Sequence, residues 1–360
     1  MPRRRWPVRE AMARAVWYGE GFDALLARAV LTPFEWIYGA VSLMDGARRA
    51  REAGRTQVPT VSIGNLTVGG TGKTPIAAWF AAQLRERGRA PALLLRGYGD
   101  DEALVHAVLN PDVPVLADAD RRRAAAQAIE SGATVLVLDD AFQHRQMPRD
   151  ADVVVVSADL WSDLPVRLLP AGPFREPLSA LRRASLIIVT RKAASSARAA
   201  EVARQLTLAS GGVPLAVAHV APGRLCAWTG GASESCEVLR GQRVLAISGI
   251  GAPDAFLMQL ATAGAEVQAA SFGDHHAFTV RDVQDLVARA AQVDRVMCTL
   301  KDAVKLGPQW PAHAPPLWYL SQLVVIETGT ASVEAVLDRL MSPAASLTPA
   351  SAGPESTPNG

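Results

Sequence analysis

The stretch NLTVGGTGKTP, residues 65–75, decides the fold of this chain. It contains most of a phosphate-binding loop. The strict pattern G-x-x-x-x-G-K-[ST] requires glycine five residues before Gly72, where this chain has Thr67. Gly69, Gly70 and Gly72 still allow the backbone to wrap around an anion with its N–H groups pointing inward. The missing glycine weakens the pattern match but leaves the chemistry of the loop in place.

The side chains after the glycines complete a nucleotide site. In loops of this kind the lysine, here Lys73, reaches the β- and γ-phosphates, and the hydroxyl of Thr74 ligates Mg²⁺. The helix that follows adds its positive N-terminal end. A glycine-rich turn with an incidental lysine is the structural alternative. We predict that the nucleotide phosphates are bound by Thr67, Val68, Gly69, Gly70, Thr71, Gly72, Lys73 and Thr74.

Apolar runs alternate with helical stretches along the chain. A short run at 58–65 precedes the loop, and the helix after the loop ends at Gly88. Further apolar runs lie at 90–99, 113–117, 133–140, 151–158 and 184–191. This alternation is typical of a mostly parallel sheet covered by helices on both faces. We therefore predict an α/β fold of the P-loop NTPase type.

The rhythm changes at residues 215–231, which indicate a crossing into a second, smaller α/β unit. The tail is rich in proline, serine, alanine and glycine, a composition typical of disorder. The predicted organisation is an N-terminal helical segment (1–55), a P-loop core (56–220), a smaller α/β domain (221–341) and a disordered tail (342–360). An alternative is that the last strand and helix of the smaller domain return to the core.

Composition excludes several classes of protein. The net charge of +2 is too small to indicate nucleic-acid binding. The cysteines, Cys226, Cys236 and Cys298, are few and lack the spacing of a metal site, which favours a reducing compartment over a disulfide framework. The oligomeric state is not indicated.

The N-terminal segment is basic, and it lacks a secretory signal. Its most apolar window, residues 24–44, contains Arg28, Pro33 and Glu35, which argues against a membrane-spanning helix. Two interpretations remain. The segment forms ordinary amphipathic helices that pack on the domain, or it forms an interfacial helix that lies on an anionic leaflet.

Two carboxylates, Asp139 and Asp140, end the apolar run VLVLDD. In a parallel sheet the carboxyl ends of the strands form the ligand-binding edge. Paired carboxylates are costly to bury there without a cation, so a Mg²⁺ role is natural. A solvated acidic turn is the structural alternative. Together with the loop, the pair indicates phosphoryl transfer or nucleotide hydrolysis.

Taken together, the motifs resemble the tetraacyldisaccharide 4'-kinase family. The resemblance includes SIGNLTVGGTGKTP, RGYG followed by DDE, LDDAFQHRQMPRDADVVVV, LLPAGPFREPLSALRRASLIIVTR, ISGIGAPDAF, FGDHHAFT and KDAVKL. These blocks follow one another from about residue 30 to residue 306. The family also accounts for threonine at position 67, and it places glycine where this chain has Ala141.

The resemblance implies an enzyme that transfers the γ-phosphate of ATP, with Mg²⁺, to the 4'-hydroxyl of a lipid-bearing glucosamine disaccharide 1-phosphate. It also implies attachment to the cytoplasmic face of the bacterial inner membrane through the N-terminal helices, as a peripheral or monotopic protein. Trp36 and Tyr38 would then lie at headgroup depth, with arginines facing the lipid phosphates.

The resemblance further implies a catalytic pair, and it implies a catalytic role for Lys73 as well. His275, in FGDHHAF, would pair with Asp101 from the loop after the strand ALLLRGYG. We expect Asp101 to be the base and His275 to orient it or tune its pKa. The reverse division remains open, as does the choice between Asp100 and Asp101.

The resemblance also implies less specific roles for several other residues. Arg121 and Arg175 are expected to contact the substrate or the γ-phosphate, because guanidinium groups suit phosphate. Glu176 joins Thr74, Asp139 and Asp140 as an expected metal ligand. Surface salt bridges are the alternative for these residues. Gln143 and His144 are expected behind the site, and Lys301 and Asp302 are expected to be structural or near the nucleotide.

Two other functions compete with this interpretation. The first is a P-loop kinase or ligase acting on a soluble metabolite, which would have no use for membrane-binding helices. The second is a non-catalytic nucleotide-dependent switch, which would need the loop but not His275 with Asp101.

Overall fold

The computed structural model of the protein describes residues 8–51, 56–97, 100–251 and 253–342. The predicted disordered tail therefore lies outside the described residues, apart from Ser342. The strands are β1 Thr60–Gly64, β2 Pro91–Leu95, β3 Val115–Ala117, β4 Val135–Asp139, β5 Ala151–Ser157, β6 Leu186–Arg191, β7 Leu215–Ala227, β8 Ser233–Glu234, β9 Arg243–Ser248, β10 Glu266–Ser271, β11 Arg295–Thr299 and β12 Leu317–Thr328.

The α-helices are α1 Val8–Tyr18, α2 Phe22–Arg51, α3 Lys73–Glu86, α4 Asp100–Leu109, α5 Arg121–Glu130, α6 Ser196–Ser210, α7 Pro253–Thr262, α8 Val280–Ala290, α9 Leu300–Leu306 and α10 Thr330–Met341. Three short 3-10 helices are also present among the described residues: η1 Leu178–Arg183, η2 Cys236–Leu239 and η3 Gly307–Gln309.

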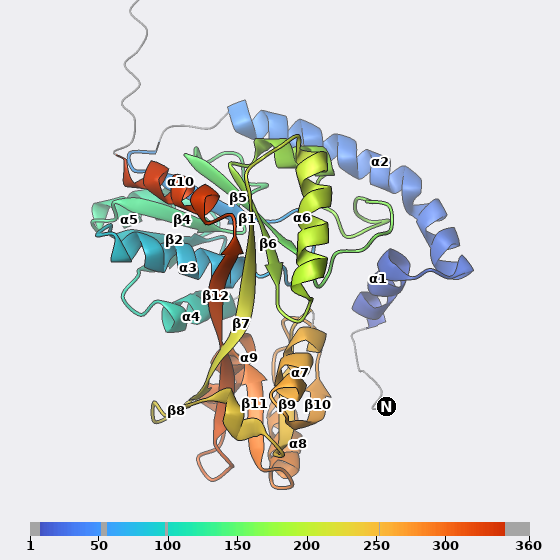
Figure 1. Ribbon diagram of the computed structural model, residues 1–360, viewed down its shortest axis with the longest axis vertical. Coiled ribbons are helices and arrows are strands. Elements are labelled where there is room, and N and C mark those ends of the chain that lie inside the picture. Colours follow the sequence, from blue (N-terminus) through green and yellow to red (C-terminus); the bar gives the residue numbers. More distant parts are fainter. Residues whose placement is uncertain (1–7, 52–55, 98–99, 252, 343–360) are drawn as a thin grey trace, which may run out of the picture.

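One mixed sheet runs through the described part of the chain (Figure 1). Its strands lie in the order β10-β9-β11-β12-β7-β6-β5-β1-β4-β2-β3, and β8 pairs with β7. Neighbouring strands are parallel except where β7 pairs with β12 and with β8. The predicted P-loop-like α/β class is confirmed. The sequence did not predict the antiparallel pairs.

The larger part of the sheet carries helices on both faces (Figure 1). Alternate residues of its strands pack against α3 and α10 on one side and against α5 and α6 on the other. In β5, for example, Val153 and Val155 join the first group, whereas Val154 and Val156 join the second. Because successive side chains of a strand point to opposite faces, a strand covered on both sides reads as a continuous apolar run.

Strands β7 and β12 connect the larger and smaller parts of the protein (Figure 1). They pair over most of their length, from Trp318 opposite Ala227 to Thr328 opposite Val217. After β12, α10 returns to pack on α3 and β7. The boundary predicted at residue 220 lies inside β7, a continuous strand. The division into domains stays a prediction.

Helices α1 and α2 lie along the outside of the larger part (Figure 1). They attach through polar groups. Glu35 forms an ion pair with Arg167 at 3.1 Å and accepts a hydrogen bond from the Leu168 N–H at 2.6 Å. Arg28 of α2 donates to the carbonyl of Val16 in α1 at 2.8 Å and so joins the two helices. The buried side of α2 therefore includes two charged side chains, whereas an ordinary surface helix buries an apolar stripe. No helix in the described ranges is long and apolar enough to cross a bilayer.

The end of β1 is packed so closely that only glycine fits. A Cβ on Gly64 would lie 2.5 Å from the Cβ of Phe142, which follows the acidic pair. We predict that Gly64→Ala lowers the free energy of unfolding by about 1–3 kcal/mol, because overpacking forces the backbone to shift. Chemical denaturation measures this change.

Gly21→Ala is the matched control, since a Cβ there meets no atom within 4 Å. Equal stability of the Gly64 and Gly21 variants would contradict the close packing.

Candidate functional site

The predicted phosphate loop connects β1 to α3. Its residues 68–74 line a cavity of about 380 Å³. Gly72 caps α3 with φ of 89°, a left-handed conformation that favours glycine. The hydroxyl of Thr190, near the end of β6, donates to the Thr71 carbonyl at 2.7 Å. The loop is therefore attached to the neighbouring strand end as well as to its own helix.

Thr67 lies where the strict pattern has glycine, and its backbone needs no glycine. It forms an isolated antiparallel bridge with Phe174, and the next residue, Val68, donates to the Pro173 carbonyl at 2.9 Å. Thr67 is not among the residues with positive φ. A β-branched residue suits such an extended position. Thr67 also does not line the cavity, unlike the other predicted loop residues.

Asn65 organises the inside of the loop, and we did not predict this role. Its buried side chain donates to the Thr67 carbonyl at 2.7 Å and to the Thr71 hydroxyl at 3.1 Å. Its Oδ1 accepts from Nζ of Lys73 at 3.3 Å. The residue stands in the motif, between the strand and the glycines, and a polar amide at the end of a buried strand was the available signal.

Asp140 lies between two cations, Lys73 and Arg175. Its carboxylate is 3.5 Å from Nζ of Lys73 and 3.1 Å from the guanidinium of Arg175. Burial alone would raise the pKa of Asp140, but Lys73 and Arg175 outweigh it and the pKa is lowered. Asp140 has φ of 48°, which is rare for a residue with a side chain and is typical of functional sites. Ala141 does not have positive φ, so its Cβ causes no strain there.

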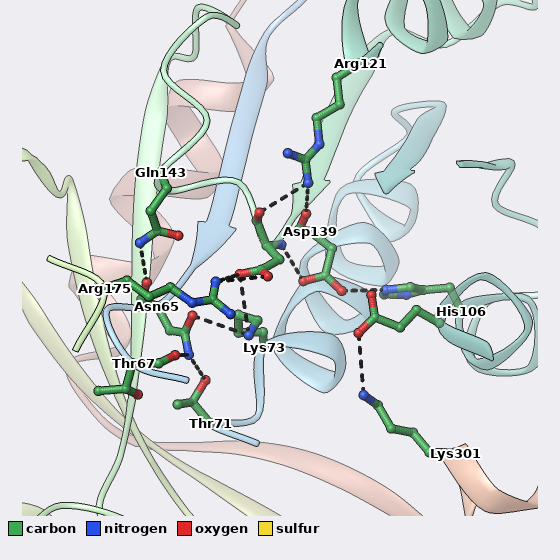
Figure 2. Close-up of polar contacts among 12 residues, drawn as sticks. Asn65, Thr67, Thr71, Lys73, His106, Arg121, Asp139, Gln143, Arg175 and Lys301 are labelled. Carbon is green, nitrogen blue, oxygen red and sulfur yellow. Dashed lines mark hydrogen bonds and ion pairs between the residues drawn. The ribbon is translucent and has the colours of Figure 1, made fainter. Parts of the chain in front are cut away.

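Asp139 lies behind Asp140 and does not line the cavity. Its carboxylate contacts Nε2 of His106 at 2.9 Å. Arg121, predicted to contact substrate, is buried and donates to the backbone carbonyls of Asp139 and Asp140, at 2.6 and 3.2 Å (Figure 2). Its position favours support of the strand end over contact with substrate, and its predicted role stays untested.

The remaining predicted groups surround this edge. Arg175 lines the cavity, whereas Glu176 is buried behind it and pairs with Arg183 at 2.8 Å. The amide of Gln143 donates to the Asn65 carbonyl at 2.7 Å. Burial lowers the pKa of His144 to about 4, and nearby guanidinium groups act in the same direction. The imidazole of His144 is therefore neutral at pH 7.

The cavity extends from the loop to the smaller part of the protein. On the loop side it is lined by Lys73, Thr74, Asp140 and Arg175. On the other side it is lined by residues of α4, by Gly251, Asp274 and His275, and by the start of α9. A ligand in this cavity would touch both parts of the protein, which are joined by β7 and β12.

The structure brings His275 and Asp101 together. Nδ1 of His275 lies 3.2 Å from Oδ2 of Asp101. Asp101 lies in the first turn of α4, not in a loop as we expected, because acidic residues favour a helix N-terminus. His275 is about half exposed and lines the cavity, whereas Asp101 is buried behind it and does not. The side chain of Asp100 lies outside the described residues, so that alternative is not tested.

The contact changes the proton affinity of both partners. The hydrogen bond from His275 lowers the pKa of Asp101 to about 2, against the opposing effect of burial. The same hydrogen bond raises the pKa of His275, against burial, and Asp274 adds to the rise while Lys301 opposes it. His275 has φ of 54°, so both sides of the cavity have a residue in the left-handed region.

Lys301 and Asp302 differ in their surroundings. Lys301 lines the cavity, with Nζ 3.5 Å from a carboxylate oxygen of Glu102. Asp302 is fully buried, accepts from the Gly249 N–H at 3.0 Å and from the Thr299 hydroxyl at 2.6 Å, and does not line the cavity. Lys301 is therefore near the ligand space, and Asp302 organises the turn after β9.

Comparison with known proteins decides the family. The family model described as tetraacyldisaccharide-1-P 4'-kinase matches residues 27–112 and 99–342. The chain belongs to this family. The tetraacyldisaccharide 4'-kinase of Anaeromyxobacter sp. (strain Fw109-5) is 40% identical over 332 residues, which cover 83% of this chain and 88% of that protein. The protein of the same name from Anaeromyxobacter sp. (strain K) is 38% identical, with 95% and 99% covered.

The fold of this kinase family member is also that of a solved structure. The crystal structure of LpxK from Aquifex aeolicus in complex with ATP superposes with a TM-score of 0.67. Its sequence identity is 24%, and the match covers 88% of this chain and 100% of the other. The predicted resemblance to the tetraacyldisaccharide 4'-kinases and the predicted use of ATP are confirmed.

The pH dependence of kcat would show which member of the His275–Asp101 pair is the base. If His275 is the base, kcat rises with pH through a pKa above 6.5, since only the neutral imidazole accepts a proton. Asp101→Asn removes the largest cause of the raised pKa, so the midpoint moves down towards 6.5.

If Asp101 is the base, its pKa of about 2 makes kcat flat across neutral pH. Steady-state kinetics from about pH 5 to 9 measures the difference. His219→Gln, outside the cavity lining, serves as the control and keeps the wild-type midpoint.

Proposed function

We propose that this kinase transfers the γ-phosphate of ATP to the 4'-hydroxyl of a lipid-bearing glucosamine disaccharide 1-phosphate in lipid A biosynthesis. Family membership supports the reaction. The observation in the structure that carries the proposal is the cavity between Lys73 and Asp140 on one side and His275 on the other. One side has groups that suit phosphates, and the other has a group that suits a hydroxyl proton.

In this proposal the oxygen of the sugar hydroxyl forms a bond to the γ-phosphorus as the bond from that phosphorus to ADP breaks. The hydroxyl proton passes to the His275–Asp101 pair. His275 faces the cavity, which favours it as the group that meets the hydroxyl, with Asp101 orienting the ring from behind. Lys73 and Arg175 hold charge that develops on the transferred group and on ADP.

The residues present fit a Mg²⁺ ion. Hydroxyl and carboxylate oxygens are its preferred ligands. Thr74 and Asp140 line the cavity and would hold it, with Asp139 behind them acting directly or through water. When bound, Mg²⁺ would neutralise negative charge on the phosphates of ATP. Glu176 has one buried carboxylate oxygen without a partner among the described residues, but it stands outside the cavity lining, and its metal role stays a prediction.

The exposed surface of α1 and α2 supports binding to a membrane surface. Large apolar side chains face solvent along them: Met12, Phe22, Leu25, Leu26, Val30, Phe34, Trp36, Ile37, Val41, Leu43 and Met44. We call this set the apolar face of the N-terminal helices. The narrow buried side of α2 instead carries Ala24, Arg28, Glu35 and Gly39. A helix that buries charge and exposes apolar side chains needs an apolar partner.

The two aromatic residues predicted at headgroup depth do not share one environment. Trp36 is 72% exposed and belongs to the apolar face. Tyr38 is partly buried, and burial raises its pKa, with Arg175 and Glu176 within electrostatic range. The cavity residue Arg175 is thus close to the helix proposed to lie on lipid. That proximity supports entry of the lipid from the helix side.

A kinase or ligase acting on a soluble metabolite is not favoured. It would share the loop and the acids, but neither the family match nor the apolar face of the N-terminal helices would be expected. A non-catalytic switch would not need a His–Asp pair in the cavity.

The reaction is tested by transfer of labelled γ-phosphate from ATP to purified tetraacyldisaccharide 1-phosphate in mixed micelles. We expect lipid product from the wild type and at least about a 100-fold loss for Lys73→Ala, because an electrostatic group at the transferred phosphate is removed. ATP binding without lipid product, with substrate that an active family member accepts, would contradict the proposal.

Membrane binding is tested by sedimentation with vesicles that contain anionic lipid. Phe34→Ser combined with Ile37→Ser should weaken binding by about 10-fold or more, since each removes about 1.5–3 kcal/mol of apolar burial. Leu208→Ser is the matched control, because Leu208 is 85% exposed on α6, outside the apolar face. If the double variant and the Leu208 variant lose vesicle binding to the same extent, or if neither loses it, the membrane role of the N-terminal helices is contradicted.

A further inference from the structure

A buried histidine, His106, contacts the strand end that carries the acidic pair. It lies on α4 and is fully buried, and its Nε2 is 2.9 Å from Oδ2 of Asp139 (Figure 2). Its other ring nitrogen, Nδ1, is also buried and has no hydrogen-bond partner among the described residues. Asp139 is therefore the polar group that orients the ring. A carboxylate only accepts, so Nε2 carries the proton and donates it.

The carboxylate of Asp139 is held at both oxygens. Oδ2 meets His106, and Oδ1 accepts from the backbone N–H of Asp140 at 2.8 Å. Arg121 holds the backbone of the same two residues from the other side. Without His106, one oxygen of a nearly buried carboxylate would lose its partner, and the side chain would be able to rotate about its terminal bond.

Helix α4 also extends to the opposite wall of the cavity. Asp101, five residues before His106, contacts His275, and Glu102 pairs with Lys301 of α9. Glu102 and His106 are four residues apart, so they lie on the same side of the helix. The contact between His106 and Asp139 therefore attaches the helix that carries one half of the catalytic pair to the strand end that faces the phosphates.

We propose that His106 is a positioning residue for the magnesium side of the site. It fixes the orientation of the Asp139 carboxylate, and through it the acidic pair, for Mg²⁺ bound with ATP. The proposal rests on the proposed function, because it assumes that nucleotide and metal bind at this edge. Groups that orient metal-binding carboxylates through a hydrogen bond commonly change metal affinity or activity by about 10–100-fold.

Two substitutions of similar shape separate positioning from packing. His106→Gln keeps a donor near the position of Nε2, and His106→Met fills similar space without one. Titration calorimetry gives the affinity for ATP with Mg²⁺ and with EDTA in place of the metal, and thermal unfolding of each protein gives its stability. We expect the enhancement of ATP affinity by Mg²⁺ to fall about 10-fold or more in the Met variant and to be largely kept in the Gln variant.

Asp139→Asn is combined with His106→Met in a double-mutant cycle. If His106 acts through Asp139, adding His106→Met to Asp139→Asn produces little further loss of the Mg²⁺ enhancement, because the two side chains form one unit. A Met variant that melts at a lower temperature but keeps the full enhancement would overturn the proposal. Full additivity of the two substitutions would also overturn it.

The outcome for the wild type separates this proposal from the proposed function. If Mg²⁺ does not enhance ATP binding by the wild-type protein, the assignment of the nucleotide site fails before His106 is tested. If the wild type shows the enhancement and the Met and Gln variants both match it, only the role of His106 fails.

Discussion

The site depends on one constraint, the placement of a negative charge at the end of β4. The Asp140 carboxylate lies between Lys73 and Arg175, and its backbone has the left-handed conformation that turns the side chain toward them. The two cations stabilise this partly buried carboxylate. The Asp140 carboxylate therefore contacts both the loop before α3 and the segment that carries Arg175, and so helps to fix them relative to the turn after β4.

The rest of the structure places the imidazole of His275 on the other side of the cavity from this charge. The antiparallel pair of β7 and β12 extends the sheet into a smaller part, and the loop with His275 faces the cavity from there. Helix α4 contacts both sides, through Asp101 and through His106. The cavity thus lies between the phosphate loop and the loop with His275, and α4 contributes to its lining. The attachment of α2 through Glu35 leaves the apolar face of the N-terminal helices exposed.

Much of this could be predicted from local sequence. The loop residues 68–74, the strand that ends in the acidic pair and the alternation of buried runs with helices all depend on neighbours in sequence. Other features could not be predicted from local patterns, because their partners are distant in the chain. The contact of His106 with Asp139 spans 33 residues. The pairing of Asp101 with His275 spans 174 residues, and only the family resemblance predicted it. The chemistry of Arg121 suggested a substrate contact, and only the fold shows that it is buried against backbone carbonyls; its predicted role stays untested.

The amino-acid sequence by itself determined the phosphate loop, the parallel α/β core and, by resemblance, the kinase family. Each of these follows from short motifs and from hydrophobic periodicity, which are local properties. Only the tertiary structure decided which groups face the cavity. It placed His275 and Asp140 at the surface of that space, and Asp101 and Asp139 behind them. It also decided that α2 presents its apolar side outward. Burial and direction depend on packing between distant segments, and sequence spacing does not encode them.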